Sequence, residues 1–387
     1  MKNWQKILLR SLSYILVAAL ASTATIALLS RGSTKLLELE TIIHQRFIGE
    51  ADMDKARDAA AAAMVDAIGD RWSYYISAEE YAAYKENKNN AYVGIGITIS
   101  AREDGTGFDI LEVTPGGSAQ EGGVLPGDIL VEAEGESAPD MTIDQVKALI
   151  RGKAGTEVTI GVLRNGEKHV FTLERREIRV QVASGQLLEG NIGLVTIANF
   201  NTNCADETIG AVNELLEQGA KGLIFDVRNN GGGYVSEMLD VLDYLLPEGV
   251  LYRDLDYMGN EGEEVSDADC VELPMAVLMN GNSYSAAEFF AAAMKEFDWA
   301  ILVGEHTTGK GHYQNTLRLS DGSAVNLSTG KYFTPNGVNL TEEGGLAPDV
   351  EVPVDEETAA LIYAQALEPA EDPQILAALA AVEEKIG

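Results

Sequence analysis

The sequence predicts an α/β protein with a separate β-rich module and helical segments at both ends. Over 177–355, short apolar runs bounded by turn residues alternate with helical patterns, which is typical of an α/β core. Over 91–176, glycine-interrupted strands and a hairpin signal indicate a small β module. The flanking stretches 33–90 and 356–387 have the composition of helices, and apolar residues make up 46% of the 387 residues, enough for a packed core.

The first 32 residues differ from the rest. Lys2, Lys6 and Arg10 precede an uncharged, mostly apolar stretch from Ser11 to Ser30. About 20 such residues span a bilayer as a helix, whereas a signal-peptide core has about 7–15. We expect a signal anchor that leaves the rest of the chain outside the cytoplasm. A cleaved signal peptide remains the alternative, because small residues between Ala18 and Ala24 offer a cleavage site.

Composition limits the partners. The net charge of −33 argues against nucleic acid and is mainly a property of a soluble surface. Cys204 and Cys270 are too few for a disulfide framework, and both a pair and two free thiols stay open. The four histidines are scattered, so the sequence implies no metal and no cofactor.

The elements follow in order along the chain. Asp52 to Ile68 is predicted as a helix, and Tyr92 to Ile99 as one glycine-interrupted strand. Asn165-Gly166 between two alternating runs predicts a β-hairpin. In the α/β core we expect buried strands followed by helices, with strands at 192–197, 222–227, 275–279 and 300–304 and helices at 204–218, 235–246 and 286–297.

Ser285 and Lys310 carry the chemistry that we expect. Ser285 lies at the turn between an apolar strand and a helix, and Lys310 lies between two glycines after a later apolar strand. A serine at such a turn with a lysine nearby is the pattern of a nucleophile and its base. Taken alone, Ser285 is better explained as a helix cap, and the competing explanation for Lys310 is a surface lysine. Ser283 is a competing nucleophile, and His306 or His312 a competing base.

The β module resembles a PDZ domain of the circularly arranged bacterial kind. Pro115-Gly116-Gly117-Ser118-Ala119, Leu125 to Leu130 and Arg151 to Thr156 carry its signatures. The resemblance places the residues that receive a peptide's terminal carboxylate at Gly94, Ile95, Gly96 and Ile97.

The whole chain is similar to the carboxyl-terminal processing peptidases, from about residue 45 to 380. The motifs lie in the family's order, at Gly69–Tyr75, Asp226–Gly233, Asn282–Glu288, Gly304–Gln314, Lys331–Gly337 and Gly345–Val350. Gly231, Thr308, Arg71 and Trp72 depart from the family pattern, but Ser285, Lys310 and Gln314 do not.

The resemblance implies a crotonase-like α/β protease core, an inserted PDZ domain and a Ser–Lys dyad. Ser285 would be the nucleophile, Lys310 the base and Gln314 the residue that orients Lys310. A lysine can act as a base only where its pKa falls from about 10.4 toward neutrality. Backbone N–H groups of Gly232 and Ala286 are the predicted oxyanion hole, and Glu288 is expected to be structural.

The implied domains are a membrane segment (1–32), a helical region (33–90), a PDZ domain (91–176), a protease core (177–355) and a C-terminal helical segment (356–387). The implied function is cleavage of cell-envelope proteins near apolar C-termini, with the PDZ domain recognising the C-terminus or gating the site. The implied partners are the protein substrate, the membrane and a second copy of the chain in a homodimer. A catalytically silent PDZ-type scaffold is the alternative, and an acyl-thioester enzyme of the crotonase superfamily a more distant one.

Overall fold

The computed structural model describes residues 34–387, so the predicted membrane segment at 1–32 lies outside the described residues. The chain folds as two units that divide between Ser77 and Ala78. Among residues 34–387, no helix combines the length and the apolar character needed to cross a bilayer.

The first unit contains helices α2 (Thr34–Arg46) and α3 (Met53–Asp66) and strand β1 (Tyr74–Ile76). The α3 helix confirms the helix predicted from Asp52, whose side chain caps it by accepting the Lys55 N–H at 3.0 Å. On and just after α2, large apolar side chains are exposed to solvent: Leu36, Leu37, Leu39, Ile42, Phe47 and Ile48.

The second unit begins with α4 (Ala78–Lys88) and continues into the β module. Its sheet has the order β3-β4-β5-β7-β8, with β6 paired to β5. The strands are β3 (Ile97–Ala101), β4 (Phe108–Val113), β5 (Ile129–Ala133), β6 (Glu136–Ser137), β7 (Glu157–Arg164) and β8 (Glu167–Glu174), and the helices are α5 (Ser118–Gly122) and α6 (Ile143–Ile150). The predicted hairpin is confirmed: Asn165 and Gly166 both have positive φ between β7 and β8.

The prediction of a single strand from Tyr92 to Ile99 was wrong. The chain breaks at Gly96, which has φ +80°, into β2 (Ala91–Gly94) and β3. The β2 strand pairs with β9 (Arg176–Arg179) and β3 pairs with β4, so the two halves join different neighbours. An apolar period of two residues gives no sign of where a strand changes partner.

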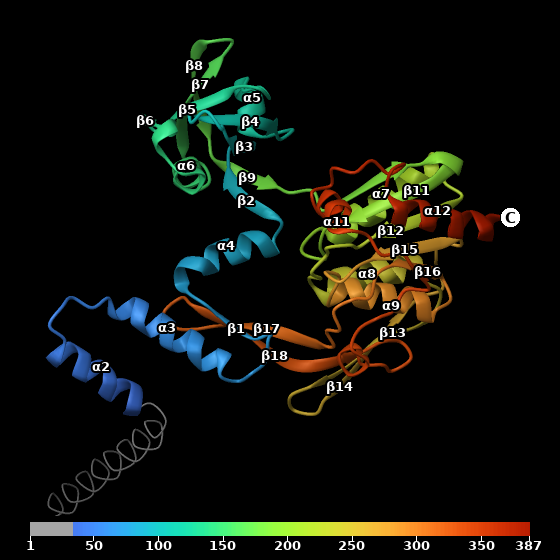
Figure 1. Ribbon diagram of the computed structural model, residues 1–387. Coiled ribbons are helices and arrows are strands. Elements are labelled where there is room, and N and C mark those ends of the chain that lie inside the picture. The colour runs from blue at the N-terminus through green and yellow to red at the C-terminus, as the bar shows by residue number, and fades with distance from the viewer. Residues whose placement is uncertain (1–33) are drawn as a thin grey trace, which may run out of the picture. The chain divides into compact units, whose positions relative to one another are not determined.

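The α/β core is a sheet of order β10-β11-β12-β15-β16-β19, in which β10 is antiparallel and the others are parallel. Its strands are β10 (Ala183–Leu187), β11 (Ile192–Ile197), β12 (Gly222–Asp226), β15 (Met275–Met279), β16 (Ala300–Gly304) and β19 (Val350–Glu351). The predicted strands at 192–197, 222–227, 275–279 and 300–304 are therefore confirmed (Figure 1).

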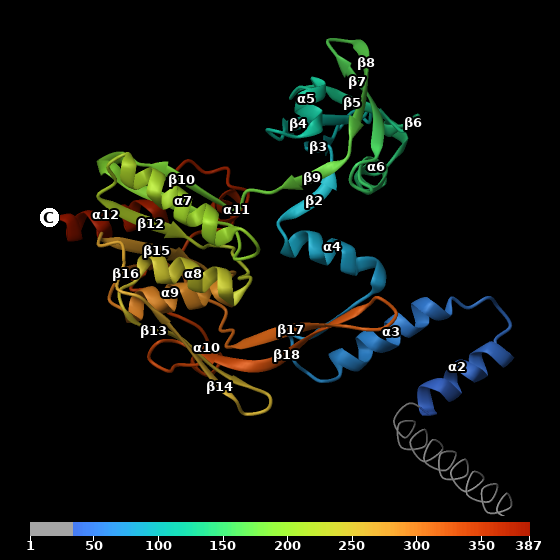
Figure 2. The same ribbon diagram turned by 180° about the vertical axis from the view of Figure 1, so that it is seen from behind.

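Helices cover both faces of this sheet. Figure 2 shows α7 (Cys204–Glu217), α8 (Val235–Leu245) and α9 (Ala286–Glu296) side by side. These helices lie over one face of the sheet, where strand residues such as Phe225 and Val277 share a core with them. The opposite face carries Ile224, Ala276 and Leu278, and these pack against α12 (Pro373–Ile386). Strands buried on both faces explain why the sequence shows continuous apolar runs rather than alternation.

A second sheet was not predicted. It contains β13 (Gly249–Asp256), β14 (Glu261–Ser266), β17 (His312–Arg318) and β18 (Ala324–Phe333), with β13 between β14 and β18 and with β17 on β18. The β17–β18 hairpin is the long pair of strands labelled in Figure 1. Short helices α10 (Leu340–Glu343) and α11 (Glu356–Tyr363) complete the second unit.

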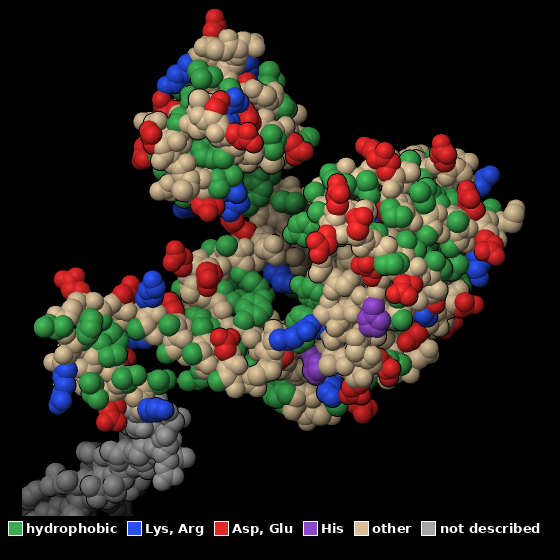
Figure 3. All heavy atoms as spheres, viewed as in Figure 1, with side chains coloured by type: hydrophobic (Ala, Val, Ile, Leu, Met, Phe, Trp, Pro, Cys, Tyr) green, Lys and Arg blue, Asp and Glu red, His purple; other side chains and the backbone are tan. Residues whose placement is uncertain are grey.

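Acidic side chains are scattered over the face of the molecule seen in Figure 3, and do not gather in one patch.

Candidate active site

Ser285 lies at a strained turn between β15 and the first residue of α9. Its backbone has φ +61° and ψ −127°, a conformation that residues with a Cβ rarely adopt. The Ser285 carbonyl accepts the Phe289 N–H at 2.8 Å, which begins the helix. A strained strand-to-helix turn exposes a serine hydroxyl and places it beside the positive end of the helix dipole.

The neighbouring Ser283 has a structural role. It is fully buried, and its hydroxyl donates to the Val227 carbonyl at 2.7 Å and accepts the Asn280 N–H at 3.0 Å. The first bond ties the turn before Ser285 to the residue that follows β12, and the second closes the turn itself. Because the Ser283 hydroxyl is already used inside the protein, the geometry favours Ser285 over its competitor.

Three asparagines beside this turn were missed by the sequence analysis. The Asn280 amide group donates to Asn229 Oδ1 at 3.0 Å, and Asn282 donates to the same oxygen at 3.0 Å. The Asn229 N–H donates back to Asn280 Oδ1 at 3.0 Å. The sequence did offer one signal for Asn229, namely its residue type. Asn229 has φ +59°, a left-handed conformation that asparagine tolerates well.

Three consecutive glycines are packed closely beside Ser285. A Cβ on Gly232, which has φ +85°, would lie 2.7 Å from the Ser285 Cβ. A Cβ on Gly231 would lie 2.6 Å from the Tyr284 hydroxyl, and one on Gly233 would overlap the Phe200 main chain. These glycines are therefore required by close contact, and the turn is not merely a flexible connection.

The two predicted oxyanion donors differ in their surroundings. The Ala286 N–H is at the start of α9 and has no acceptor among residues 34–387, as expected for the first turn of a helix. The Gly232 N–H donates to Asn230 Oδ1 at 2.8 Å. Gly232 can receive an oxyanion only if it shares or releases that bond, so its role stays a prediction.

Lys310 lies on the loop between β16 and β17 and is 9% exposed. Its Nζ lies 5.9 Å from the centroid of the Tyr284 ring, one residue before Ser285. Thr308, one of the departures from the family pattern, donates its hydroxyl to the Gly281 carbonyl at 2.7 Å. The lysine loop is thus tied directly to the nucleophile turn.

Glu288 anchors the lysine loop to the helix that carries Ser285. Its fully buried carboxylate accepts the Gly309 N–H at 2.8 Å, the Lys310 N–H at 2.9 Å and the Thr307 hydroxyl. Burial raises the pKa of the Glu288 carboxyl, and these hydrogen bonds act in the opposite direction. The contacts agree with the structural role expected for Glu288.

Gln314 lies on β17, and its side chain is attached to the sheet. The amide group donates to the His312 carbonyl at 3.1 Å and to the Ser328 hydroxyl at 3.0 Å on β18. Neither bond involves Lys310, and the orienting role of Gln314 stays a prediction.

The two loop histidines interact with their own surroundings. His306 Nδ1 lies 2.9 Å from the Thr307 carbonyl oxygen, and His312 Nδ1 lies 3.5 Å from the Thr341 hydroxyl. Neither contact involves Ser285.

Tyr332 is a further site residue that the sequence analysis recognised only as part of a motif. It is 3% exposed, and its hydroxyl donates to the Lys310 main-chain carbonyl. The only signal was its place in the segment Lys331–Gly337, which the resemblance had singled out.

The predicted carboxylate-binding residues of the β module line a groove of about 220 Å³. Gly94, Ile95, Gly96 and Ile97 form one side, and Lys147, Ile150 and Arg151 of the α6 region are also in its lining. Among residues 34–387, the N–H groups of Ile95 and Gly96 have no acceptor. The groove thus joins free backbone donors, apolar side chains and positive charge.

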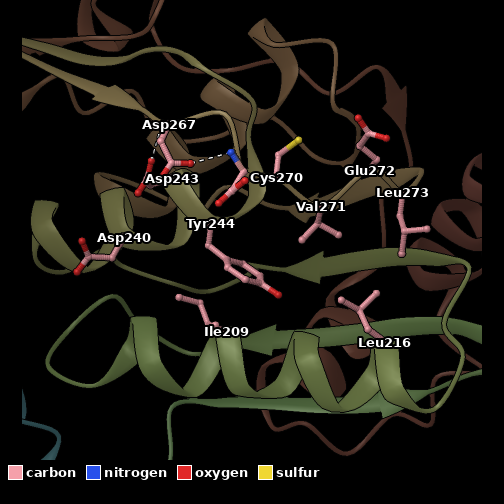
Figure 4. A pocket seen from close by; sticks show the side chains of 11 residues that line it. Ile209, Leu216, Asp240, Asp243, Tyr244, Asp267, Cys270, Val271, Glu272 and Leu273 are labelled. Carbon is pink, nitrogen blue, oxygen red and sulfur yellow. Dashed lines mark hydrogen bonds between the residues drawn. The ribbon is translucent and has the colours of Figure 1, made fainter.

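A larger pocket of about 630 Å³ lies elsewhere, between α7, α8 and the segment 267–273 (Figure 4). Ile209, Leu216 and Tyr244 are among its apolar lining residues, and several acidic side chains share the lining. None of the predicted catalytic residues lines it. Cys270 does, and it is a free thiol, as is the buried Cys204.

Comparison with known proteins identifies the two parts of the chain. The model of peptidase family S41 matches residues 191–352, and that of the PDZ domain matches residues 110–164. The carboxy-terminal processing protease CtpA of Bacillus subtilis (strain 168) is 31% identical over 324 residues, which cover 81% of this chain and 68% of that protein. A CtpA-like serine protease of Staphylococcus aureus (strain COL) is 29% identical over 82% of this chain and 64% of its own length.

A solved structure from Bacteroides fragilis NCTC 9343, described as an S41 protease, shares the fold. It has a TM-score of 0.53 at 16% identity and covers 84% of this chain and 90% of its own. Together these matches define the chain as a serine-type peptidase with a PDZ domain. Within that class, it belongs to the carboxy-terminal processing proteases of peptidase family S41.

Proposed function

We propose that this protein is an endopeptidase with a Ser285–Lys310 dyad, which cleaves cell-envelope proteins near their C-termini. The observation that supports it best is the strained turn that places Ser285 at the start of α9, together with the attachment of the lysine loop to that helix by Glu288. The nucleophile and its base thereby belong to one local framework, as a two-residue mechanism requires.

The reaction would proceed through an acyl-enzyme. Ser285 Oγ attacks the peptide carbonyl while the neutral Lys310 amine takes the hydroxyl proton. The Ala286 N–H, joined by Gly232 once its bond to Asn230 is released, stabilises the oxyanion. When the C–N bond breaks, Lys310 returns the proton to the leaving amine. Water then attacks the ester and gives a proton to Lys310, which passes it to Ser285 as the acid product leaves.

The first test compares residues 33–387 with the Ser285→Ala and Lys310→Ala variants on an unstructured protein with an apolar C-terminus. We expect cleavage by the parent and a loss of at least about 10³-fold in both variants, with circular dichroism unchanged. Cleavage that survives Lys310→Ala would exclude a lysine base and favour His306 or His312. A parent that binds the substrate without cleaving it would support the catalytically silent scaffold.

The PDZ domain is proposed to recognise the substrate's C-terminus. The free N–H groups of Ile95 and Gly96 suit a terminal carboxylate, Ile97 and Ile150 suit an apolar last residue, and the exposed Lys147 adds a positive charge at the rim. Gating of the active site by the same domain belongs to this proposal.

Reversing the charge at the groove is expected to weaken peptide binding. In a chain that carries Ser285→Ala to prevent cleavage, Lys147→Glu should lower the affinity for a labelled peptide with an apolar C-terminus by roughly 5-fold, because a rim charge contributes about 1 kcal/mol. Fluorescence anisotropy measures the change. Lys153→Glu is the control, since Lys153 is exposed but does not line the groove. An equal loss in both variants would reflect the overall charge and contradict a role for the groove.

Two further proposals concern the chain outside the core. We propose that residues 1–32 anchor the protein in the cell membrane with the catalytic part extracytoplasmic, or are cleaved on secretion; membrane fractionation with antibody to the core distinguishes the two. We also propose a homodimer that uses the exposed apolar side chains on and after α2. Sedimentation velocity of residues 33–387 would overturn it by showing only monomer.

A further inference from the structure

The pocket between α7, α8 and the segment 267–273, called the α7–α8 groove below, has an apolar floor. The side chains that form this floor are Ile209, Leu216, Tyr244, Val271 and Leu273. Figure 4 shows Ile209 and Leu216 rising from α7 on either side of Tyr244. Ile209 and Leu216 are two helical turns apart, so the floor runs for about 10 Å along α7. The groove volume of about 630 Å³ lies in the range of sites that hold ligands.

The rim of the α7–α8 groove is acidic. Five carboxylate side chains from α8 and from the segment after β14 are in the lining, and all except Asp243 are exposed: Asp240, Asp243, Asp267, Asp269 and Glu272. Within residues 34–387, no lysine or arginine lines the groove, and none of the five carboxylates forms an ion pair. A positively charged occupant would therefore be attracted without having to displace a cation of the protein.

Hydrogen bonds fix the walls of the groove. The Asp267 N–H donates to Asp243 Oδ1 at 2.9 Å, which attaches the segment 267–273 to α8. The Tyr244 hydroxyl donates to Asn213 Oδ1 at 2.9 Å, which joins α8 to α7. Because the groove is already formed, a partner that binds there does not have to order it, and less of the binding free energy is lost.

We propose that the α7–α8 groove binds a basic, amphipathic helical segment of a partner protein. The apolar face of such a helix would rest on Ile209, Leu216 and Tyr244, and its flanking lysines or arginines would extend their flexible side chains to the acidic rim. A floor of about 10 Å accepts two turns of helix. A second copy of this chain, with a net charge of −33, does not supply that positive charge, and neither does an anionic partner.

This binding is separate from catalysis. Ser285, Lys310 and Gln314 are not in the lining of the α7–α8 groove, and Gly94–Ile97 line a different groove. The proposal therefore does not rest on the Ser–Lys mechanism, and it can be tested in a chain that does not cleave.

The test is the binding of a labelled peptide to the full chain carrying Ser285→Ala, measured by fluorescence anisotropy in a nonionic detergent, with detergent alone as the blank. The peptide has about 14 residues, with leucines at helical spacing on one face and lysines on the other. Its C-terminus is amidated, so it offers no terminal carboxylate to the PDZ groove.

Reversing two charges of the rim is expected to lower the affinity. The double variant Asp240→Lys, Asp269→Lys should bind the peptide about 10-fold more weakly or worse, and both residues are exposed, so the fold should be kept. The matched control is Glu214→Lys, Glu217→Lys, which changes the net charge equally at exposed positions of α7 outside the lining. Its affinity should stay within about 2-fold of the parent.

Cys270 reports where the peptide binds. It is a half-buried free thiol in the lining of the groove, and the other cysteine, Cys204, is buried in the core. Saturating peptide should slow the reaction of Cys270 with iodoacetamide by at least about 5-fold, because the bound helix covers the thiol.

Each outcome decides the proposal. Binding that is weakened only in the rim variant, with Cys270 protected, supports it. No binding to the parent overturns it, and so does an equal loss in the rim and control variants. Equal binding of a peptide with glutamine in place of leucine, or displacement by the same concentration of spermidine, would show a site for charge alone and overturn it too. An unchanged rate of Cys270 modification in the bound state would place the peptide elsewhere, with the same consequence.

Discussion

Glu288→Gln is expected to lower kcat/KM by about 100-fold while the chain stays folded. The Glu288 carboxylate accepts two backbone N–H groups of the lysine loop and the Thr307 hydroxyl. Glutamine offers one oxygen, and its NH2 group would face one of those N–H donors. A buried donor left without an acceptor costs about 1–3 kcal/mol, and the displaced loop moves Lys310 away from Ser285.

The control for this variant lies at the other end of the same helix. Glu296 also accepts one hydroxyl and one backbone N–H, from Thr334 and Asn336, each at 2.7 Å. Glu296→Gln should therefore cost similar stability in urea unfolding but leave kcat/KM within about 3-fold of the parent. Equal activity losses in the two variants would show that Glu288 contributes only general stability to α9.

Glu288 also predicts a difference in the pH dependence of stability. Burial raises the pKa of the Glu288 carboxyl above its ordinary value of 4.5. Just above pH 4.5, therefore, the folded chain retains a proton on Glu288 that the unfolded chain has released. The free energy of unfolding then falls as pH rises through this window. Glu288→Gln should remove that part of the slope, which urea unfolding at a series of pH values measures. Parallel curves for the two proteins would contradict it.

The second large effect is expected from Asp372→Ala, which should lower the free energy of unfolding by about 3 kcal/mol. Asp372 accepts from the buried Arg228 at 2.8 Å, and it caps α12 through the N–H groups of Gln374 and Ile375. Arg228 keeps its paired bonds to Asp226, at 2.9 and 2.6 Å, so its charge is not left wholly without a partner.

Urea unfolding measures this loss. Glu371→Ala is the control, because Glu371 is the adjacent carboxylate and is exposed; its effect should stay within about 0.5 kcal/mol. A loss of less than about 1 kcal/mol in Asp372→Ala would mean that the residue acts as a helix cap alone and that its ion pair with Arg228 adds nothing.

The sequence was sufficient for features that depend on local chemistry. Strands such as Met275–Met279 are continuous apolar runs because both faces of the sheet are covered. The turn at Ser285 was predictable because an apolar strand pattern ends shortly before Ser285 and a helical pattern begins directly after it. The Asn165-Gly166 hairpin follows from two positive φ values that these residues adopt easily.

The features that were missed depend on contacts that the apolar pattern of the chain does not mark. The β17 strand is mostly polar, and its partner lies beyond a turn, so no apolar alternation marks it. Tyr332 on β18 consequently received no role, although its motif was recognised. Likewise, the hydrogen bond from the Gly232 N–H to Asn230 Oδ1 depends on the direction in which the Asn230 side chain points. The spacing of residues along the chain does not specify that direction.

The packing of α12 has a consequence for the order in which the protein can be completed during synthesis. This helix follows every strand of the core sheet in the chain, yet it packs against Ile224, Ala276 and Leu278 on one face of that sheet. Until residues 373–386 leave the ribosome, that face stays open to water and Arg228 lacks Asp372. A nascent chain therefore carries Ser285 and Lys310 before one face of the core sheet beneath them can be covered, so we expect the core to complete its packing only at the end of synthesis.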